Sequence, residues 1–239
     1  MKKISVVTVC RNALAALEKT IDSVDGQTAR DSIEFVVVDG ASTDGTAGRV
    51  AEMTARGVID RSVSEADRGI YDAMNKGVAM SSGEWVIFMN AGDVFVDNNT
   101  VERILADGCL DTADVVYGDV MKNGETKRAG EPRNCHRMFF CHQSCLGRRD
   151  LLATTPFDTR HRLSADFKWV KTMLRDGRRF RHLDFAVADF DTSGVSNTRR
   201  SEGLRDNMSV VMEMDRGQER LRLMSHLVLP YIISRLRGK

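Results

Sequence analysis

A carboxylate beside a glycine follows a hydrophobic run in the first half of the chain. Asp93 ends the segment 90–93, which comes directly after the apolar residues 85–89. A carboxylate at the end of a strand, next to a glycine that lets a ligand approach the backbone, suits a hard divalent cation bound together with phosphate oxygens. Mg²⁺ and Mn²⁺ bind through few protein carboxylates in such sites. The sequence therefore predicts a metal site at Asp93.

Two other aspartates lie in a polar segment that follows an earlier apolar run. Asp39 and Asp44 fall within residues 39–46, directly after the apolar residues 33–38. Their carboxylates could accept charge-assisted hydrogen bonds from a nucleobase or a ribose. An Asp-Gly pair after a strand is also ordinary turn composition, so this segment alone does not decide between the two interpretations.

The elements that must position these residues alternate between strands and helices. Their apolar patterns predict strands at 4–9, 33–38, 58–63 and 85–89. They also predict one helix that begins after a cap at Asn12 and two more helices at 46–55 and 70–80. This order implies an α/β fold with a mostly parallel central sheet and helices on both faces. Ligands of such sheets bind outside the carboxyl ends of the strands, where the polar segments 10–12, 39–44 and 90–93 all fall. That coincidence is the main argument for an active site.

The second half of the chain has shorter elements and the opposite charge. Its patterns predict a strand at 114–121, a helix at 165–176, a strand at 179–188 and, from residue 199, helices interrupted at Pro230. Residues 1–120 carry 11 Lys and Arg against 20 Asp and Glu, whereas residues 121–239 carry 24 against 14. The acidic half can surround a cation and the basic half can face phosphates or an anionic membrane, or the halves simply attract each other.

Composition excludes several classes of protein. Apolar residues make up 42% of the chain and charged residues 29%, which is typical of a globular protein and not of a disordered one. Five cysteines without a CxxC pair, in a chain without a secretory leader pattern, predict reduced thiols and a cytoplasmic location. No apolar run approaches the length of a membrane-spanning helix. Nucleic-acid binding is not expected, because the basic half shows no patch interleaved with aromatic residues.

Four segments, in this order and spacing, resemble family 2 glycosyltransferases. They are residues 4–9 (ISVVTV), 38–46 (VDGASTDGT), 65–77 (EADRGIYDAMNKG) and 88–93 (FMNAGD). More narrowly, they resemble bacterial enzymes that build exopolysaccharide, colanic-acid-type or lipopolysaccharide chains. The resemblance is strong over about the first 100 residues and loose over the next hundred. It implies a GT-A fold, a UDP- or GDP-sugar donor, Mn²⁺ or Mg²⁺, and transfer with inversion to a glycan or lipid-linked acceptor.

The resemblance also assigns roles to residues around the donor. It implies that Asp39 binds the nucleobase, with the Thr8 backbone and Arg11 nearby, and that Arg68 contacts the base or the diphosphate. Asp93 is expected to hold the metal. Asn90 stands where the family usually has a carboxylate, and we assign it to donor binding. Separately, and from composition alone, the polar segment 191–196 is expected to be a loop that closes over donor phosphates.

The catalytic base is expected in the second half of the chain. Asp166, in residues 164–167 (SADF), matches the acidic position of the family at that place. An inverting transfer needs one carboxylate within hydrogen-bond reach of the acceptor hydroxyl, opposite the leaving diphosphate. A helix cap or a first-turn acid favoured by the helix dipole explains the same residue locally. His142, in residues 141–144 (CHQS), resembles the His-Gln segment of the family and could contact the acceptor or a phosphate, or be a structural histidine.

These assignments divide the chain into parts. Residues 1–200 are expected to form the GT-A catalytic domain, with 1–110 as the nucleotide-sugar-binding half and 111–200 as the acceptor-side half. Residues 201–239 form a basic amphipathic helical segment, whose part 216–239 could lie on the inner face of the cytoplasmic membrane or pack on protein. The second functional hypothesis is a catalytically silent nucleotide-sugar-binding scaffold of a polysaccharide assembly complex.

Overall fold

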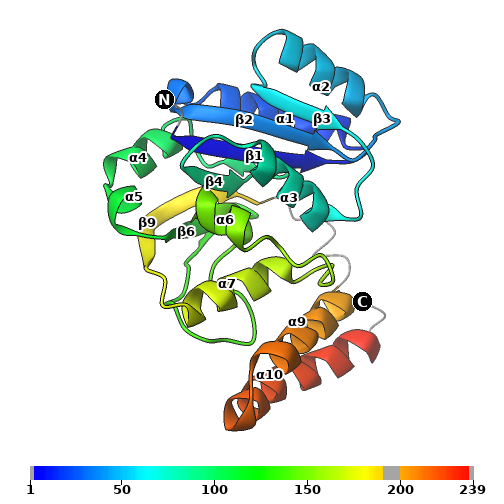
Figure 1. Cartoon of the computed structure of the whole chain (residues 1–239), viewed down its shortest axis with the longest axis vertical. Helices are drawn as coiled ribbons and strands as arrows, with labels where there is room; N and C mark the ends of the chain where they lie inside the picture. Colours follow the sequence, from blue (N-terminus) through cyan, green and yellow to red (C-terminus); the bar gives the residue numbers. More distant parts are fainter. Residues whose placement is uncertain (1–2, 191–199, 237–239) are drawn as a thin grey trace.

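Parallel strands from the first half of the chain form one side of a nine-stranded sheet (Figure 1). They are β1 (Ile4–Cys10), β2 (Ile33–Asp39), β3 (Arg61–Ser64) and β4 (Trp85–Phe88), in the order β3-β2-β1-β4. The structure, a computed structural model, describes residues 3–190 and 200–236. Every residue of β1, β2 and β4 is buried, as expected for β-branched runs covered on both faces.

The other side of the sheet is mixed. Strand β8 (Cys145–Arg148) is antiparallel to β4, and β6 (Val115–Lys122) is antiparallel to β8 but parallel to β9 (Phe180–Asp189). Two short strands complete it, β5 (Val94–Phe95) beside β9 and β7 (Glu125–Lys127) beside β6. The predicted α/β class is confirmed, and the parallel order predicted from residues 4–89 gives way to a mixed order beyond β4.

Helices cover both faces of this sheet. The bounds are α1 (Leu14–Asp25), α2 (Thr46–Ala55), α3 (Ile70–Met80), α4 (Thr100–Ala106), α5 (Cys109–Thr112), α6 (Arg149–Thr154) and α7 (Ala165–Arg175). Alternating residues of β1 join different cores: Val6 packs with residues of α1 and α2, and Val7 packs with residues of α3, α6 and α7. The expected two-faced arrangement is therefore confirmed.

The start of α1 differs from the prediction. Asn12 does not cap this helix: its backbone has a φ of 49°, and its Oδ1 accepts a hydrogen bond from the Thr43 amide at 2.8 Å. The Leu14 amide instead donates to Asp44 Oδ2 at 3.3 Å, from the loop after β2. Because the two polar loops satisfy each other's backbone groups, they form one rigid rim at the carboxyl ends of β1 and β2.

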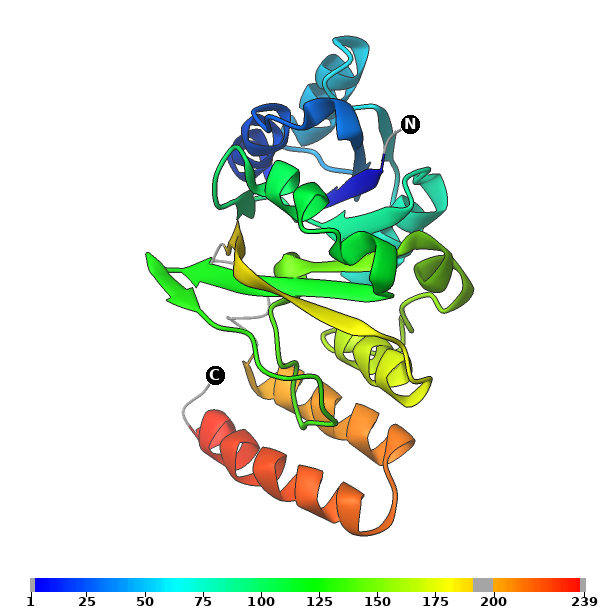
Figure 2. The ribbon, with the colours of Figure 1, turned by 90° about the vertical axis from the view of Figure 1, so that its left-hand side faces the viewer.

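A helical hairpin follows the sheet. Helices α9 (Arg200–Met214) and α10 (Gly217–Leu236) run in opposite directions and lie beyond α7, away from the sheet (Figure 2). Val210, Val211, Leu223 and Leu227 pack with Phe167 of α7. The predicted interruption at Pro230 is wrong, since α10 continues through it. Proline removes one hydrogen bond to the carbonyl four residues earlier, and that residue, His226, is exposed to water.

Part of the prediction from sequence falls on residues that the structure does not describe. The predicted phosphate-covering loop at 191–196 lies outside the described residues, as do residues 237–239 of the C-terminal segment. None of the helices within residues 3–190 and 200–236 is both long enough and apolar enough to cross a bilayer.

Candidate active site

A cleft of about 680 Å³ opens at the carboxyl ends of β1 and β4. One wall belongs to the first half of the chain and contains Arg11, Arg68, Asn90 and Asp93. The facing wall comes from later segments, and its members are Gln143, Thr159, Arg162, Leu163, Phe190 and Glu202. The structure therefore brings together four of the site residues predicted from sequence, at the sheet edge where the topology places ligands.

The turn after β4 holds Asn90 and Asp93 at the edge of the cleft. The Asp93 amide donates to the Asn90 carbonyl at 2.9 Å, and Gly92 between them has a φ of 104°, which glycine adopts readily. The buried Thr20 hydroxyl of α1 fixes the turn by donating to the Asp93 carbonyl at 2.9 Å and accepting from the Gly92 amide at 2.9 Å. The turn is thus supported from beneath by a helix of the same wall.

These two residues offer oxygen ligands of the kind that Mg²⁺ and Mn²⁺ prefer. Asp93 is only 3% exposed yet lines the cleft. Asn90 Oδ1 is buried and accepts no hydrogen bond from any residue that the structure describes. A buried acceptor without a donor is costly, and a bound cation would satisfy it. The residues present therefore fit a divalent cation.

The two arginines of this wall are exposed cations. Arg68 is held by Asp72, whose Oδ1 lies 3.0 Å from the guanidinium, and this hydrogen bond holds the pKa of Asp72 below its usual value. Asp67 Oδ1 accepts a hydrogen bond from the Gly69 amide at 2.9 Å. Arg11 lies at the end of β1. Both guanidinium groups can face an anionic ligand in the cleft.

Two of the residues predicted to bind the donor lie beneath the cleft surface. Asp39 is fully buried and accepts hydrogen bonds from the Ser42 amide at 3.0 Å and from the Ser64 hydroxyl at 2.5 Å. Thr8 is also fully buried, and its hydroxyl donates to the Met89 carbonyl at 2.6 Å. Neither residue lines the cleft. Their donor-binding roles stay predictions, and the contacts present hold the loops that carry Arg11 and Asn90.

Asp166 and His142 come together at the start of α7. Asp166 Oδ1 accepts a hydrogen bond from the Tyr71 hydroxyl at 2.8 Å, and Asp166 Oδ2 lies 3.5 Å from His142 Nδ1. The His142 ring stacks on Phe88 with centroids 5.2 Å apart. Burial lowers the pKa of His142, partly opposed by the charge of Asp166. We therefore expect a neutral imidazole beside the carboxylate at neutral pH.

Tyr71 is the residue of this group that sequence reasoning missed. The pattern of α3 places Tyr71 among core residues, and it is indeed buried, but it also lines the cleft. Burial, and then the negative charge of Asp166, raises the pKa of Tyr71 well above its usual value, so the phenol stays a hydrogen-bond donor. Nothing in the sequence around residue 71 indicates that its hydroxyl reaches a side chain 95 positions away.

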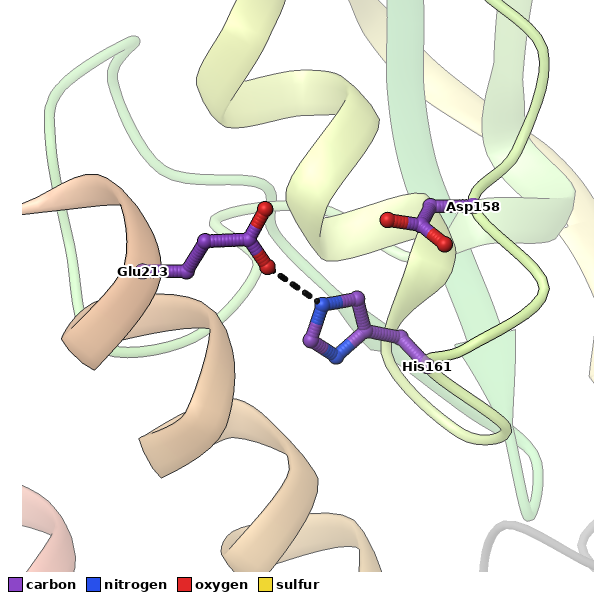
Figure 3. Close-up of side chains that lie close together, drawn as sticks. All are labelled: Asp158, His161 and Glu213. Carbon is purple, nitrogen blue, oxygen red and sulfur yellow. Dashed lines mark hydrogen bonds and ion pairs between the residues drawn. The ribbon is translucent and has the colours of Figure 1, made fainter.

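A second group of potential metal ligands lies apart from Asp93. Asp158, His161 and Glu213 point toward one another, and their ligand atoms lie within 4.8 Å (Figure 3). Lys168 Nζ lies 2.6 Å from Asp158 Oδ2 and 2.5 Å from Glu213 Oε1, so an ammonium group already bridges the two carboxylates. His161 Nε2 lies 3.1 Å from Glu213 Oε2. This group is an ion-pair cluster that attaches α9 to α7 and to the preceding loop.

Comparison with known proteins decides the family. Residues 5–173 match the family model described as Glycosyl transferase family 2. A PGL/p-HBAD biosynthesis glycosyltransferase of Mycobacterium tuberculosis is 33% identical over 204 residues, which cover 81% of this chain and 79% of that protein. The chain belongs to glycosyl transferase family 2. An uncharacterized glycosyltransferase of the same organism is 37% identical over 100 residues, covering 42% of this chain and 37% of that protein.

Solved structures confirm the GT-A fold of this family 2 glycosyltransferase. TarS of S. aureus, in complex with UDP, has a TM-score of 0.68 at 19% identity and covers 95% of this chain and 70% of that one. Mannosyltransferase PcManGT of Pyrobaculum calidifontis, in complex with GDP-Man and Mn²⁺, has a TM-score of 0.72 at 20% identity, with coverages of 94% and 68%. Likeness at such identities establishes the fold alone. The family establishes that the chain is a transferase enzyme, as expected.

Proposed function

We propose that this family 2 glycosyltransferase is an inverting, metal-dependent enzyme of bacterial surface polysaccharide synthesis. It moves a sugar from a UDP- or GDP-sugar to a glycan or lipid-linked acceptor. The observation that carries the proposal is the cleft lined by Asp93, Asn90 and Tyr71. Asp166 accepts a hydrogen bond from Tyr71 and, with His142, lines a separate small pocket rather than the cleft itself. The resident ligands of the neighbours, UDP in TarS and GDP-Man with Mn²⁺ in PcManGT, support this class of donor.

Donor binding falls to the wall formed by the first half of the chain. Asp93, with Asn90 beside it, would hold Mn²⁺ or Mg²⁺, which when bound neutralises the diphosphate and makes it a better leaving group. Arg11 and Arg68 lie on the same wall and would contact the nucleotide diphosphate or base. The division predicted from sequence follows: residues 1–110 bind the nucleotide sugar, and residues 111–200 bind the acceptor.

Asp166 is the proposed base. The acceptor hydroxyl oxygen attacks the anomeric carbon, its proton passes to the Asp166 carboxylate, and the bond to the diphosphate breaks with its electron pair left on the phosphate oxygen. One displacement of this kind inverts the anomeric configuration. Tyr71 holds one oxygen of the carboxylate, and the neutral His142 packs beside the other. Both are positioning residues, because they restrict the carboxylate to one orientation.

Helix α10 is the proposed contact with the membrane. Its C-terminal half exposes large apolar side chains, with Leu229 at 62%, Ile232 at 47% and Leu236 at 83% exposed, next to Arg235. Exposed apolar residues combined with basic ones suit the interface of an anionic bilayer. This supports a peripheral position on the inner face of the cytoplasmic membrane. Packing against a second subunit would give a dimer and no vesicle binding, and would contradict it.

Vesicle flotation tests the membrane contact. Replacing Leu229, Ile232 and Ile233 by serine should weaken binding to phosphatidylglycerol vesicles at least tenfold, because each side chain loses apolar burial worth about 1 kcal/mol or more. Leu221→Ser is the matched control, since Leu221 is 71% exposed on the first turns of the same helix. Equal losses in both variants would place the contact elsewhere.

Acceptor-dependent release of UDP or GDP tests the reaction. Thermal unfolding in the presence of a panel of nucleotide sugars, with and without Mn²⁺, tests donor binding. Sugars of one nucleotide should raise the unfolding midpoint of the wild type, and Asp93→Ala should remove the part of that rise that depends on Mn²⁺. Asp166→Asn should keep donor affinity and lose turnover. A catalytically silent scaffold would bind the nucleotide sugar, but neither the wild type nor any variant would form free UDP or GDP from it. Asp111→Asn, an exposed carboxylate away from the cleft, is the control.

A further inference from the structure

The loop between α6 and α7 forms part of the acceptor-side wall and is fixed at many points. At its start, the Phe157 backbone amide donates to Asn75 Oδ1 at 2.9 Å, and Asn75 Nδ2 donates to the Phe157 carbonyl at 2.9 Å. Toward its end, the Leu163 amide donates to Asp206 Oδ2 of α9 at 2.8 Å. Such a loop presents its cleft-lining side chains, Thr159, Arg162 and Leu163, from a rigid backbone.

The charged side chains of this loop are paired, with one exception. Arg160 and Lys168 bind Asp158, and their hydrogen bonds hold the pKa of Asp158 below its usual value. His161 is 4% exposed and lies between two carboxylates of α9, with Nδ1 2.9 Å from Asp206 and Nε2 3.1 Å from Glu213 (Figure 3). Arg162 is exposed, lines the cleft and makes no hydrogen bond or ion pair with any residue in 3–190 or 200–236.

The Arg162 guanidinium, held on a rigid loop with no partner among the described residues, is prepared to bind an anion. Arginine binds phosphate through two parallel hydrogen bonds, and a pre-positioned group loses little entropy when it does so. The donor diphosphate already has Arg11 and Arg68 on the opposite wall. Arg162 stands four positions before Asp166, on the side where the acceptor must lie. The anion at Arg162 therefore belongs to the acceptor.

The position of the α9–α10 hairpin indicates which kind of acceptor carries the anion that Arg162 binds. Glu202, in the first turn of α9, lines the cleft, and α10 returns antiparallel so that its C-terminal end lies beside the start of α9 (Figure 1). The exposed apolar residues of α10 are concentrated in that returning half. An acceptor that enters past this end of the hairpin can keep its lipid in the bilayer while its phosphate reaches Arg162.

We propose that Arg162 binds a phosphate of the acceptor, so that this enzyme glycosylates an acceptor carried on a lipid phosphate or diphosphate. The proposal rests on the proposed function, since it assumes that the cleft holds donor and acceptor together. It names the acceptor class and the residue that selects it.

Calorimetric titration with a matched pair of probes tests it. The probes are geranyl phosphate and geraniol, added to protein saturated with Mn²⁺ and whichever of UDP or GDP binds. The wild type should bind geranyl phosphate at least tenfold more tightly than geraniol. Arg162→Ala should weaken geranyl phosphate binding by about 10- to 100-fold, the range for a hydrogen bond to a charged group, and leave geraniol and the nucleotide unchanged. Arg162→Lys should fall between, because it keeps the charge and loses the planar fork.

The control is Arg178→Ala, which removes an exposed arginine from the turn after α7, away from the cleft. Unfolding midpoints equal to that of the wild type show that the variants fold. Three results overturn the proposal: no preference of the wild type for the phosphate probe, unchanged binding in Arg162→Ala, or loss of nucleotide affinity in that variant, which would assign Arg162 to the donor. If the wild type binds no nucleotide, the proposed function fails instead, and the two failures are distinct.

Discussion

Tyr71 has two roles that one substitution can distinguish: its hydroxyl positions the proposed base Asp166, and its ring packs in the core. Tyr71→Phe deletes the O–H that donates to Asp166 Oδ1 at 2.8 Å and keeps the ring, whose centroid lies 5.4 Å from that of Phe157. A hydrogen bond to a charged group contributes about 1.5–3 kcal/mol. Asp166 Oδ1 also accepts from the Phe167 amide at 2.8 Å, and the side chain is 18% exposed, so it is not left without donors. We therefore expect a loss of about 1.5 kcal/mol in unfolding free energy, at the low end of that range.

The same change should slow turnover more than it changes binding. With one of its restraints gone the carboxylate samples other orientations, and we expect kcat to fall about tenfold, equivalent to about 1.4 kcal/mol, with the donor KM unchanged. Acceptor-dependent nucleotide release measures this. The matched control is Tyr117→Phe, which removes another buried hydroxyl, on β6, that donates to the Gly130 carbonyl at 3.2 Å. Equal losses of kcat in the two variants, or none in Tyr71→Phe, would refute the positioning role.

The pH dependence of stability gives a second readout on Tyr71. Its pKa is raised in the folded protein, whereas the unfolded chain has the usual value of about 10. The unfolded state therefore releases this proton first, and the stability that the neutral phenol contributes is present below pH 10 and is lost as the pH rises above it. Urea unfolding at pH 8 and pH 10.5 should show a smaller decline for Tyr71→Phe than for the wild type. Equal declines would contradict the burial of this phenol.

Three further predictions concern other parts of the fold. Gly118→Ala should lower the unfolding free energy by about 1–3 kcal/mol in urea melts, because a methyl group there would lie 2.8 Å from the Phe185 carbonyl oxygen, whereas Gly48→Ala, where the added methyl meets open space, should not. Asp215→Asn should cost about 3–5 kcal/mol in the same assay, because Lys171 Nζ, 2.9 Å away, is left as a buried charge; an unchanged stability would mean that the pair is hydrated. Burial lowers the pKa of His142, so the unfolded chain takes up a proton first below pH 6.5, and stability should fall there less steeply in His142→Asn than in the wild type.

Local sequence patterns predicted the first half of the fold well. The helices expected at 46–55 and 70–80 have those bounds in the structure, and the strand expected at 4–9 is one residue longer. These segments repeat apolar residues with the period of their own element, so the pattern and the packing agree. The polar segments 10–12 and 90–93 fall at one sheet edge for the same reason, which places Arg11, Asn90 and Asp93 there, whereas Arg68 was predicted from the family resemblance alone.

Other features depend on contacts between distant segments, and no local pattern carries them. Asp39 ends its strand as expected, but its burial follows from Ser64 on the neighbouring strand, 25 positions away. The local sequence predicts Asn12 as the N-cap of α1, but in the structure the Leu14 amide at the start of α1 donates to Asp44, which lies in another loop. Helix α10 tolerates Pro230 because that stretch is exposed, which composition cannot reveal.

The ion pairs between α9 and the loop before α7 extend the site beyond the region that the family shares. The family match ends at residue 173, yet Asp206 and Glu213 hold His161, and Glu202 reaches the cleft itself. Replacing residues 200–236 by those of a relative should therefore change the shape of the cleft entrance as well as the proposed membrane contact of α10. Under the proposed function, sequence changes in α9 and α10 should change which acceptor enters the cleft and leave the preference for the nucleotide unchanged.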